Sequence, residues 1–227
     1  ASASAISWLI DERDWSCADF GEAVESLSLQ NGSSCDEIVV IGQGRPELVT
    51  IAEAFFPNRV RQANGLADCL PDLQTPLVGS IGAGIRLHDG RSLDVLRWLH
   101  ETFDIATASS AIVSAERRGK GWKIAVAERG QLTDPEHEGE ASSPADLACQ
   151  LWRSTYPVRR PPEDFWLART SSVREWQAKF DGAAVVHACT SLITASYSGE
   201  RPKRSGGLVA VPESAAVNAV SAELLFG

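Results

Sequence analysis

The sequence predicts an α/β fold in which strands and helices alternate around a largely parallel sheet. Up to about residue 105, short apolar runs alternate with segments whose apolar residues recur at helical spacing. The second of these runs, at 36–44, is apolar and β-branched, as is typical of a strand covered on both faces. Two strands flanking a helix indicate a right-handed unit, so we expect a doubly wound layer structure.

The composition is that of a soluble globular protein. The chain has 227 residues, of which 44% are hydrophobic and 22% charged, and it can bury a substantial core. We expect one domain over residues 1–227, with a first half at about 1–105 and a second half at about 106–227. No apolar run approaches the roughly 18 residues of a membrane-spanning helix, so we expect no membrane span.

Charge and cysteine content limit the expected partners and compartment. The formal net charge of −9 argues against a nucleic-acid partner, because phosphate backbones are bound by clustered Lys and Arg. The five cysteines are far apart and no two form a C-x-x-C pair, which disfavours a zinc site and a disulfide framework. We therefore expect a cytoplasmic protein.

The first half contains four predicted strands with helical segments between them. The apolar run at 6–10 predicts a strand, and Asp19 is expected to cap the helix that follows. The later segments are a strand at 36–44, a helix at 46–56, a short strand at 58–63, a helical segment broken by Pro71, a strand at 75–84 and a helix at 92–103.

The second half has a different pattern. Residues 104–130 alternate in polarity around RRGKG, which predicts a hairpin, and the acidic stretch at 131–144 predicts a loop. The remaining predicted elements are a helix at 143–154, a strand followed by a helix over 164–182, and a helix at 183–197.

Five stretches of the chain carry a resemblance to a known family. They are ISWLIDERDW, FGEAVESLSLQ, DEIVVIGQG, NGLADCLPDLQTPLVGSIGAGIRLHDGRSLDVL and DFWLARTSSVREWQAKFDG. In order and spacing, over roughly residues 5–190, they resemble the inverting glycosyltransferases of family 2. The resemblance implies a GT-A-like fold, which is a three-layer sandwich with a mostly parallel sheet. It also implies a nucleotide-binding first half and an acceptor-side second half.

The resemblance assigns nucleoside contacts to two strand ends. In the family, the loop after the first strand holds the base, a place matched here by Asp11, Glu12 and Asp14. The second strand of the family ends in Asp-Asp-Gly-Ser, whereas this chain has Gly42 and Gln43 there. Gln43 would offer an amide edge, and Gly42 would let a base or ribose approach the backbone closely. A solvated loop and a plain turn are the alternatives.

The family's metal-binding Asp-x-Asp turn has a degenerate counterpart. Its place is taken by Gly82, Ala83 and Gly84, whose side chains cannot ligate a metal. In the family, Mg²⁺ or Mn²⁺ neutralises the leaving diphosphate. We therefore predict no cofactor, with Mg²⁺ or Mn²⁺ as the alternative. Arg159 and Arg160, together with Arg201, Lys203 and Arg204, can neutralise the diphosphate in the place of a metal, or can be ordinary solvated charges.

The family's acidic catalytic base is also missing from its usual place. Glu163 and Asp164 form an adjacent carboxylate pair that can serve as base, or can be ordinary charges at a strand entrance. His187 is the nearby group that titrates close to neutral pH, and a packed core histidine is the alternative.

Two functional hypotheses follow from these residues. The first is a glycosyltransferase-like enzyme, metal-independent, that transfers a sugar from a nucleotide-sugar to a hydroxyl acceptor with inversion. The second is a catalytically inactive GT-A-like domain that binds a glycan, a nucleotide or a protein partner. Carboxylates are missing at the second strand end, the metal turn and the base, and a fold alone does not decide function.

Overall fold

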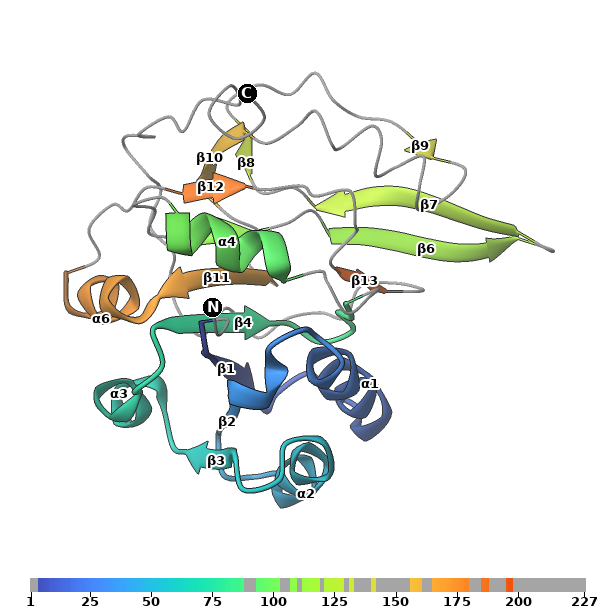
Figure 1. Ribbon diagram of the computed structural model, residues 1–227. Helices are drawn as coiled ribbons and strands as arrows, with labels where there is room; N and C mark the ends of the chain where they lie inside the picture. Colours follow the sequence, from blue (N-terminus) through green and yellow to red (C-terminus); the bar gives the residue numbers. More distant parts are fainter. Residues whose placement is uncertain are drawn as a thin grey trace.

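The computed structural model describes residues 4–87, 93–102, 107–109, 112–118, 121–128, 131–132, 140–141, 156–160, 165–179, 185–187 and 195–197. Its central feature is a mixed sheet whose first strands are all parallel (Figure 1). These strands are β1 (Ile6–Asp11), β2 (Glu37–Ile41), β3 (Val60–Ala63) and β4 (Leu77–Ile81). Their order across the sheet is β3-β2-β1-β4, and all neighbouring pairs are parallel.

The sheet continues beyond β4 with strands from the second half of the chain. In spatial order these are β11 (Phe165–Arg169), β5 (Thr107–Ser109), β12 (Val185–His187), β10 (Tyr156–Arg160) and β8 (Gln131–Leu132). β11 is antiparallel to both β4 and β5, and β12 is parallel to β5. β5 and β12 therefore run in the same direction as β1 and β4.

A second sheet contains the hairpin predicted around RRGKG. Its order is β13 (Ala195–Tyr197), β6 (Ile112–Arg118), β7 (Gly121–Glu128) and β9 (Glu140–Ala141). β6 and β7 are antiparallel, which confirms the predicted hairpin.

Helices cover both faces of the larger sheet and make three layers. They are α1 (Cys17–Ser28), α2 (Pro46–Phe55), α3 (Leu66–Cys69), α4 (Asp94–Thr102) and α6 (Thr170–Lys179), with 3-10 turns η1 (Ser33–Cys35) and η2 (Leu70–Asp72). One apolar cluster joins Trp8 and alternate residues of β1 to α1, α2 and α4. The other joins Leu9 to α3, η2 and α6 on the opposite face. The predicted three-layer α/β class is confirmed.

The centre of the core depends on a glycine. The Trp8 side chain is fully buried and stacks on Phe165, with 6.2 Å between ring centroids. A Cβ added at Gly79, on the neighbouring strand β4, would lie 2.4 Å from the Trp8 ring. Glycine at this position therefore makes room for the indole between the strands.

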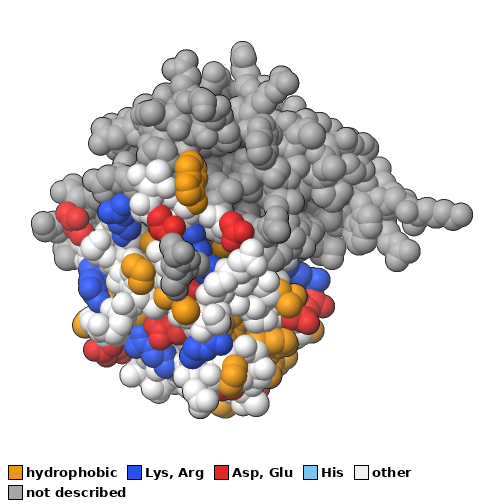
Figure 2. Space-filling model, in the orientation of Figure 1, with side chains coloured by type: hydrophobic (Ala, Val, Ile, Leu, Met, Phe, Trp, Pro, Cys, Tyr) orange, Lys and Arg blue, Asp and Glu red, His pale blue; other side chains and the backbone are white. Residues whose placement is uncertain are grey.

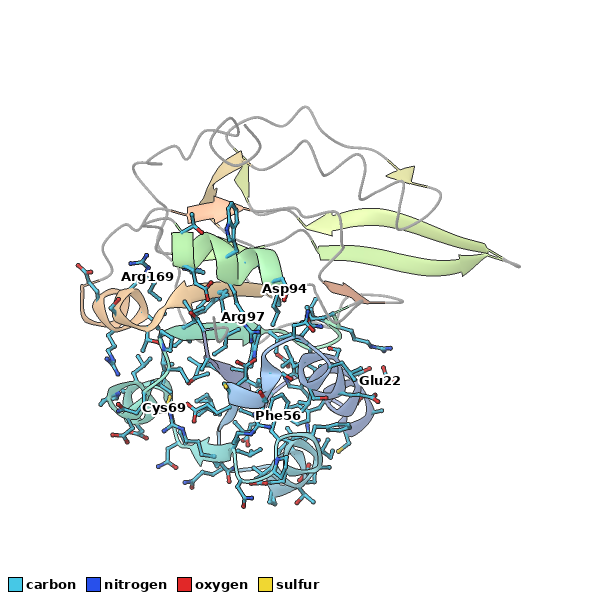
Figure 3. All side chains as sticks on the ribbon, viewed as in Figure 1. Glu22, Phe56, Cys69, Asp94, Arg97 and Arg169 are labelled. Atoms are coloured by element: carbon cyan, nitrogen blue, oxygen red, sulfur yellow. The ribbon has the colours of Figure 1, made fainter. Side chains whose placement is uncertain are left out.

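A buried ion pair joins α4 to the start of β1 and β2. The Arg97 guanidinium donates to Asp36 Oδ2 at 2.6 Å, and the two side chains are 3% and 0% exposed. Figure 3 labels Arg97 between α4 and the sheet. Asp36 Oδ1 also accepts a hydrogen bond of 2.9 Å from the Ile6 main-chain N–H. Burial raises the pKa of Asp36, and the positive charge of Arg97 opposes that rise.

Two sequence-based expectations were wrong at particular residues. Ser16, not Asp19, caps α1: Ser16 Oγ accepts from the Asp19 main-chain N–H at 3.0 Å and donates to Asp19 Oδ2 at 2.6 Å. Asp19 is the third residue of α1 and is the partner of the Ser16 cap. The segment 183–197 contains strands β12 and β13 where a helix was expected, because short apolar runs do not distinguish the two by periodicity.

The other predicted segments can be placed relative to the described residues. The predicted strand and helix of 164–182 are confirmed as β11 and α6. The predicted loop at 131–144 includes the short strands β8 and β9, and the helix expected at 143–154 lies outside the described residues. Among the helices that the structure describes, none has the length and apolar character to cross a bilayer.

Candidate functional site

The carboxyl ends of the parallel strands meet at one edge of the sheet, which we call the carboxyl-end edge. The register sets Asp11 beside Ile41 and Ile41 beside Ala63, and β4 ends one residue after Ser80, the partner of Leu9. The chain proceeds from β1 to β2 and β3 on one side, and β4 lies on the other side of β1. Ligands of open α/β sheets bind at such a switch point, outside the carboxyl ends of the strands.

Asp11 is held by a neighbouring arginine. Arg13 Nε lies 2.8 Å from both carboxylate oxygens of Asp11, and the Arg13 main-chain N–H donates to Oδ1 at 3.0 Å. The hydrogen bond with Asp11 raises the pKa of the Arg13 guanidinium. Asp14, in the same loop, is exposed and has a left-handed backbone with φ of 67°. The carboxylate of Asp11 thus shapes the loop after β1.

Glu12 bridges the end of β1 to the start of α2. Its Oε1 accepts from the Gly44 main-chain N–H at 2.9 Å, and its Oε2 accepts from the Arg45 main-chain N–H at 3.2 Å. Since α2 begins at Pro46, the carboxylate lies at the positive end of that helix. Glu12 therefore satisfies two main-chain amides just before the first residue of α2.

Gly42 is required for this position of Glu12. Its φ is 128°, and a Cβ added there would lie 2.2 Å from Cδ of Glu12. The Gly42 N–H donates to Ala63 O at 2.8 Å, and its carbonyl accepts from Gln62 Nε2 at 2.7 Å. The next residue, Gln43, is exposed. At the end of β2, the Glu12 carboxyl group thus covers Gly42, and the amide side chain of Gln43 is exposed.

An ion pair occupies the first turn of α2, beside this backbone. Arg45 Nε lies 2.7 Å from Oε1 of Glu47. This hydrogen bond lowers the pKa of Glu47.

The turn after β4 has no acidic side chain. The Ile85 N–H donates to Gly82 O at 3.2 Å, and Gly84 has φ of 79°, as the third residue of a type II turn requires. Ala83 packs against the apolar cluster around Trp8. Within the described part of the chain, no group of three or more His, Cys, Asp or Glu side chains is arranged to hold a metal ion.

The structure describes the candidate catalytic residues of the second half less completely. Glu163 and Asp164 lie outside the described residues, but β11 begins next to them at Phe165, which pairs with Ile81 at the carboxyl-end edge. His187 is the last residue of β12. Because β12 runs in the same direction as β4, the backbone of His187 lies at the same edge.

Arg159 and Arg160 are not brought to that edge by the strand that carries them. β10 runs antiparallel to β12, and its first residue, Tyr156, pairs with His187. Arg160, at the other end of β10, therefore lies toward the amino ends of the parallel strands. The side chains of Arg159, Arg160 and His187 are outside the described part of the structure.

The described surface carries mixed charge on the face shown in Figure 2. Arg side chains are interspersed there with Asp and Glu side chains over the described residues. On this face, the described residues form no broad patch of one sign of the kind that binds a nucleic-acid backbone.

Comparison with known proteins bears on the fold. Among solved structures, the chain is similar to the mannosyltransferase PcManGT from Pyrobaculum calidifontis in complex with GDP-Man and Mn²⁺, with a TM-score of 0.50 and 11% identity. The chain has a GT-A-like fold. The match covers 88% of this chain and 58% of the mannosyltransferase, so the chain spans less than two thirds of that protein's length.

Other comparisons add little to this result. A crystal structure of a mycobacterial protein aligns with a TM-score of 0.44 and 13% identity, over 89% of this chain and 68% of that one. No family model matches the sequence, and no curated protein matches it. At these identities the likeness concerns the fold alone.

Sequence reasoning missed two residues at the carboxyl-end edge. Arg45 supplies a main-chain N–H to Glu12, and the Gln62 side chain holds the Gly42 carbonyl. Pro46 at the first helical position does mark the start of α2, so the amides just before it were predictable as a position for an anion. Nothing in the sequence indicates that Glu12 is the anion that reaches them.

Proposed function

We propose that the chain is a glycosyltransferase-like domain that binds the nucleotide part of a nucleotide-sugar at the carboxyl-end edge. The observation that carries this proposal is the pairing of a GT-A-like fold with glycine turns at its switch point. Gly42 and Gly84, after β2 and β4, have φ of 128° and 79°. The turn at Gly84 has no side chain of its own, so a planar base or a ribose can lie against its backbone. Beside Gly42 the Glu12 carboxyl group fills the corresponding space, so a ligand there would contact Glu12.

We further propose that the diphosphate is bound without a metal at Gly82, Ala83 and Gly84. These residues offer only main-chain groups, whereas Mg²⁺ and Mn²⁺ prefer carboxylate oxygens. The amino end of α2 already holds the Glu12 carboxylate, so we expect the diphosphate to bind elsewhere at this edge. A metal ion held by residues outside the described part is the alternative.

In the proposed reaction, an acceptor hydroxyl oxygen attacks the anomeric carbon of the sugar. The bond from that carbon to the diphosphate oxygen breaks, the nucleoside diphosphate leaves with the electron pair, and the configuration inverts. A base takes the hydroxyl proton as the new bond forms. Glu163, Asp164 and His187 are the candidates for this base.

The second candidate function is a binding module without catalysis, for a glycan, a nucleotide or a protein. One observation favours it: the carboxylates of Asp11 and Glu12 are both engaged in internal hydrogen bonds. These two carboxylates shape the loops of the carboxyl-end edge. A nucleobase would have to displace their internal hydrogen bonds in order to bind to them.

Calorimetric titration with UDP-, GDP- and dTDP-sugars, with EDTA and separately with Mn²⁺, tests these proposals. Saturable binding of one donor in EDTA supports the metal-independent proposal, and binding only with Mn²⁺ overturns it. Release of the nucleoside diphosphate on adding hydroxyl acceptors supports the enzyme, and binding without release supports the binding module. No binding of any donor contradicts nucleotide recognition.

Alanine substitutions at Gly42 and Gly65 supply the matched variants for this titration. G42A alters the carboxyl-end edge, whereas G65A adds a methyl group where no atom lies within 4 Å. We expect donor binding to be lost in G42A and unchanged in G65A. Equal binding by both variants would place the donor away from the end of β2.

A further inference from the structure

The sequence contains two Asn-Gly pairs, and the structure places them in different surroundings. They are Asn31–Gly32, between α1 and η1, and Asn64–Gly65, between β3 and α3. In such a pair the main-chain nitrogen of the glycine can attack the side-chain carbonyl carbon of the asparagine, because glycine has no Cβ to hinder the approach. The reaction replaces a neutral amide by a carboxylate, so an open Asn-Gly pair is a site of covalent modification.

The Asn64–Gly65 pair is open. Asn64 is exposed, and its side chain forms no hydrogen bond or ion pair with the residues that the structure describes. Outside its chain neighbours, no described atom lies within 4 Å of the place where a Cβ on Gly65 would stand. Gly65 is extended, with φ of −162°, and its N–H donates to no carbonyl of the described backbone. Neither reacting group is therefore held away from the other.

The Asn31–Gly32 pair is restrained, although Asn31 is also exposed. Asn31 Nδ2 donates to Asp94 Oδ2 at 3.0 Å, and the Asn31 main-chain carbonyl accepts from the Arg97 guanidinium. Arg97 is itself fixed by the buried ion pair with Asp36. A carboxylate formed at Asn31 would also lie beside the carboxylate of Asp94, which repels it. We therefore expect this pair to react slowly.

Asn64 lies at the carboxyl-end edge, directly after the last residue of β3. That residue, Ala63, pairs with Ile41, and its carbonyl accepts from the Gly42 N–H at 2.8 Å. The peptide unit that joins Ala63 to Asn64 is thus hydrogen-bonded to the end of β2. A charge added at Asn64 would consequently lie in the region of the proposed nucleotide site.

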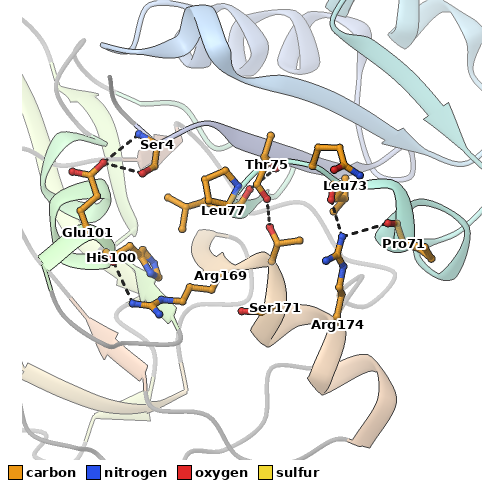
Figure 4. Close-up of a pocket in the computed structure, with 13 residues that line it drawn as sticks. Ser4, Pro71, Leu73, Thr75, Leu77, His100, Glu101, Arg169, Ser171 and Arg174 are labelled. Atoms are coloured by element: carbon orange, nitrogen blue, oxygen red, sulfur yellow. Dashed lines mark hydrogen bonds between the residues drawn. The ribbon is translucent and has the colours of Figure 1, made fainter. Parts of the chain in front are cut away.

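The segment that follows Gly65 is anchored at its far end. α3 and η2 are buried in the apolar cluster around Leu9. The loop after η2 is held by Arg174, whose Nη2 donates to Leu73 O at 2.7 Å, beside a pocket where β1 and β4 begin (Figure 4). A change in the main chain at Gly65 is therefore taken up by the loop next to Gly42, at the other end of this segment.

We infer that Asn64–Gly65 is a self-modifying site that adds a negative charge to the carboxyl-end edge as the protein ages. The Gly65 nitrogen gives up its proton to a base and forms a bond to Cγ of Asn64. The bond from Cγ to Nδ2 breaks, and the amide nitrogen takes a proton and leaves as ammonia. Water then opens the resulting succinimide ring at either carbonyl carbon, which gives aspartate or isoaspartate.

The effect on ligand binding rests on the proposed function. Both products carry a carboxylate where the amide was neutral, and isoaspartate also lengthens the main chain by one carbon. The diphosphate of a nucleotide-sugar is negatively charged, so the new carboxylate repels it. We therefore expect the modified protein to bind its donor more weakly than the fresh protein does.

Peptide mapping of the incubated full chain tests the modification without any ligand. Samples are kept at neutral and at mildly alkaline pH and are analysed by mass spectrometry over time. We expect the peptide with Asn64 to gain aspartate and isoaspartate, faster at the higher pH because the Gly65 nitrogen must lose its proton. The peptide with Asn31 should keep its amide. No conversion at Asn64, or equal conversion at both positions, overturns the inference.

Two variants separate the chemistry of the pair from general instability. G65A adds a methyl group in open space and should slow the reaction at Asn64 about tenfold by hindering the attacking nitrogen. N64Q keeps an amide but would have to form a larger ring, so it should remain unmodified over the same period. Conversion in G65A at the rate of wild type contradicts the proposed route.

Charge variants test the effect on the carboxyl-end edge. N64D should lower the affinity for the nucleotide-sugar about two- to fivefold, and added salt should reduce this difference. N58D adds the same charge before β3, at the opposite edge, and should leave affinity unchanged, as should N64Q. Equal affinities of N64D and wild type contradict an effect of the modification on binding. If wild type binds no donor, the proposed function fails, and peptide mapping alone decides the modification.

Discussion

The two edges of the sheet use their charged side chains differently. At the opposite edge, where β1 and β2 begin, Asp36 and Arg97 are 0% and 3% exposed, and they join three elements through a buried ion pair. At the carboxyl-end edge, Asp11 and Glu12 are only half-buried and hold the loops of that edge by local hydrogen bonds. The comparison indicates that charge fixes the framework at one edge and shapes an accessible loop surface at the other.

The largest expected effect comes from breaking the buried ion pair. R97M leaves the Asp36 carboxylate buried without its cation, and we expect a loss of about 3–5 kcal/mol in the free energy of unfolding at pH 7. Urea denaturation followed by circular dichroism measures it. The double variant R97M/D36N should recover part of the loss, because it removes the uncompensated charge. A loss in R97M no larger than that of a surface substitution would remove the contrast between the edges.

The same variant has an expected pH dependence. Burial raises the pKa of Asp36 and Arg97 opposes the rise, so removing Arg97 raises the folded-state pKa further above its unfolded value. A carboxyl group with a raised folded-state pKa favours the folded state most below its unfolded pKa, about 3.9, and this contribution is lost as pH rises. The loss in the free energy of unfolding of R97M relative to wild type should therefore be smaller at pH 4.5 than at pH 7. A loss that is independent of pH would show that it comes from packing and not from the charge of Asp36.

A smaller effect is expected at the carboxyl-end edge from G42A. Its φ of 128° is strained for alanine, and the added Cβ meets the Glu12 carboxyl group. We expect a loss of about 1–3 kcal/mol in the free energy of unfolding. G65A, where no atom lies within 4 Å, should change stability by less than about 0.5 kcal/mol. Similar losses in the two variants would show that the contact of the added Cβ with Glu12 does not destabilise the protein.

The smallest effect is expected from E12Q. The amide keeps one oxygen for the Gly44 or Arg45 N–H but loses the charge at the amino end of α2. We expect a loss of about 1 kcal/mol in the free energy of unfolding. E25Q makes the same charge change at an exposed position of α1 and serves as the control. A loss in E12Q as large as that in R97M would contradict the distinction between the edges.

Local patterns predicted most of the first half of the fold. The apolar run at 36–44 and the helical spacing at 46–56 correspond to β2 and α2, because hydrophobic periodicity reports directly on burial. The prediction for 183–197 was wrong because the run is too short to show a period. Val185 and Val186 are β-branched and suit a strand, but two residues do not decide between a strand and a helix. Tertiary pairing with β5 then selected the strand.

The candidate site was predictable in position but not in detail. The ends of β1, β2 and β4 meet because parallel strands place their carboxyl ends at one edge. The contact of Glu12 with Gly44 depends on strand register and loop path, which residue types do not encode.

The pairing of β4 with β11 has a consequence for how the protein is made. β4 ends at residue 81, whereas its antiparallel partner begins at residue 165. On a translating ribosome, the middle of the sheet therefore has an open edge until much of the second half has been synthesised. Unpaired apolar strands are templates for aggregation, so the open edge of β4 is exposed to wrong pairing during this interval. The second half of the chain therefore covers an edge that the first half alone leaves open.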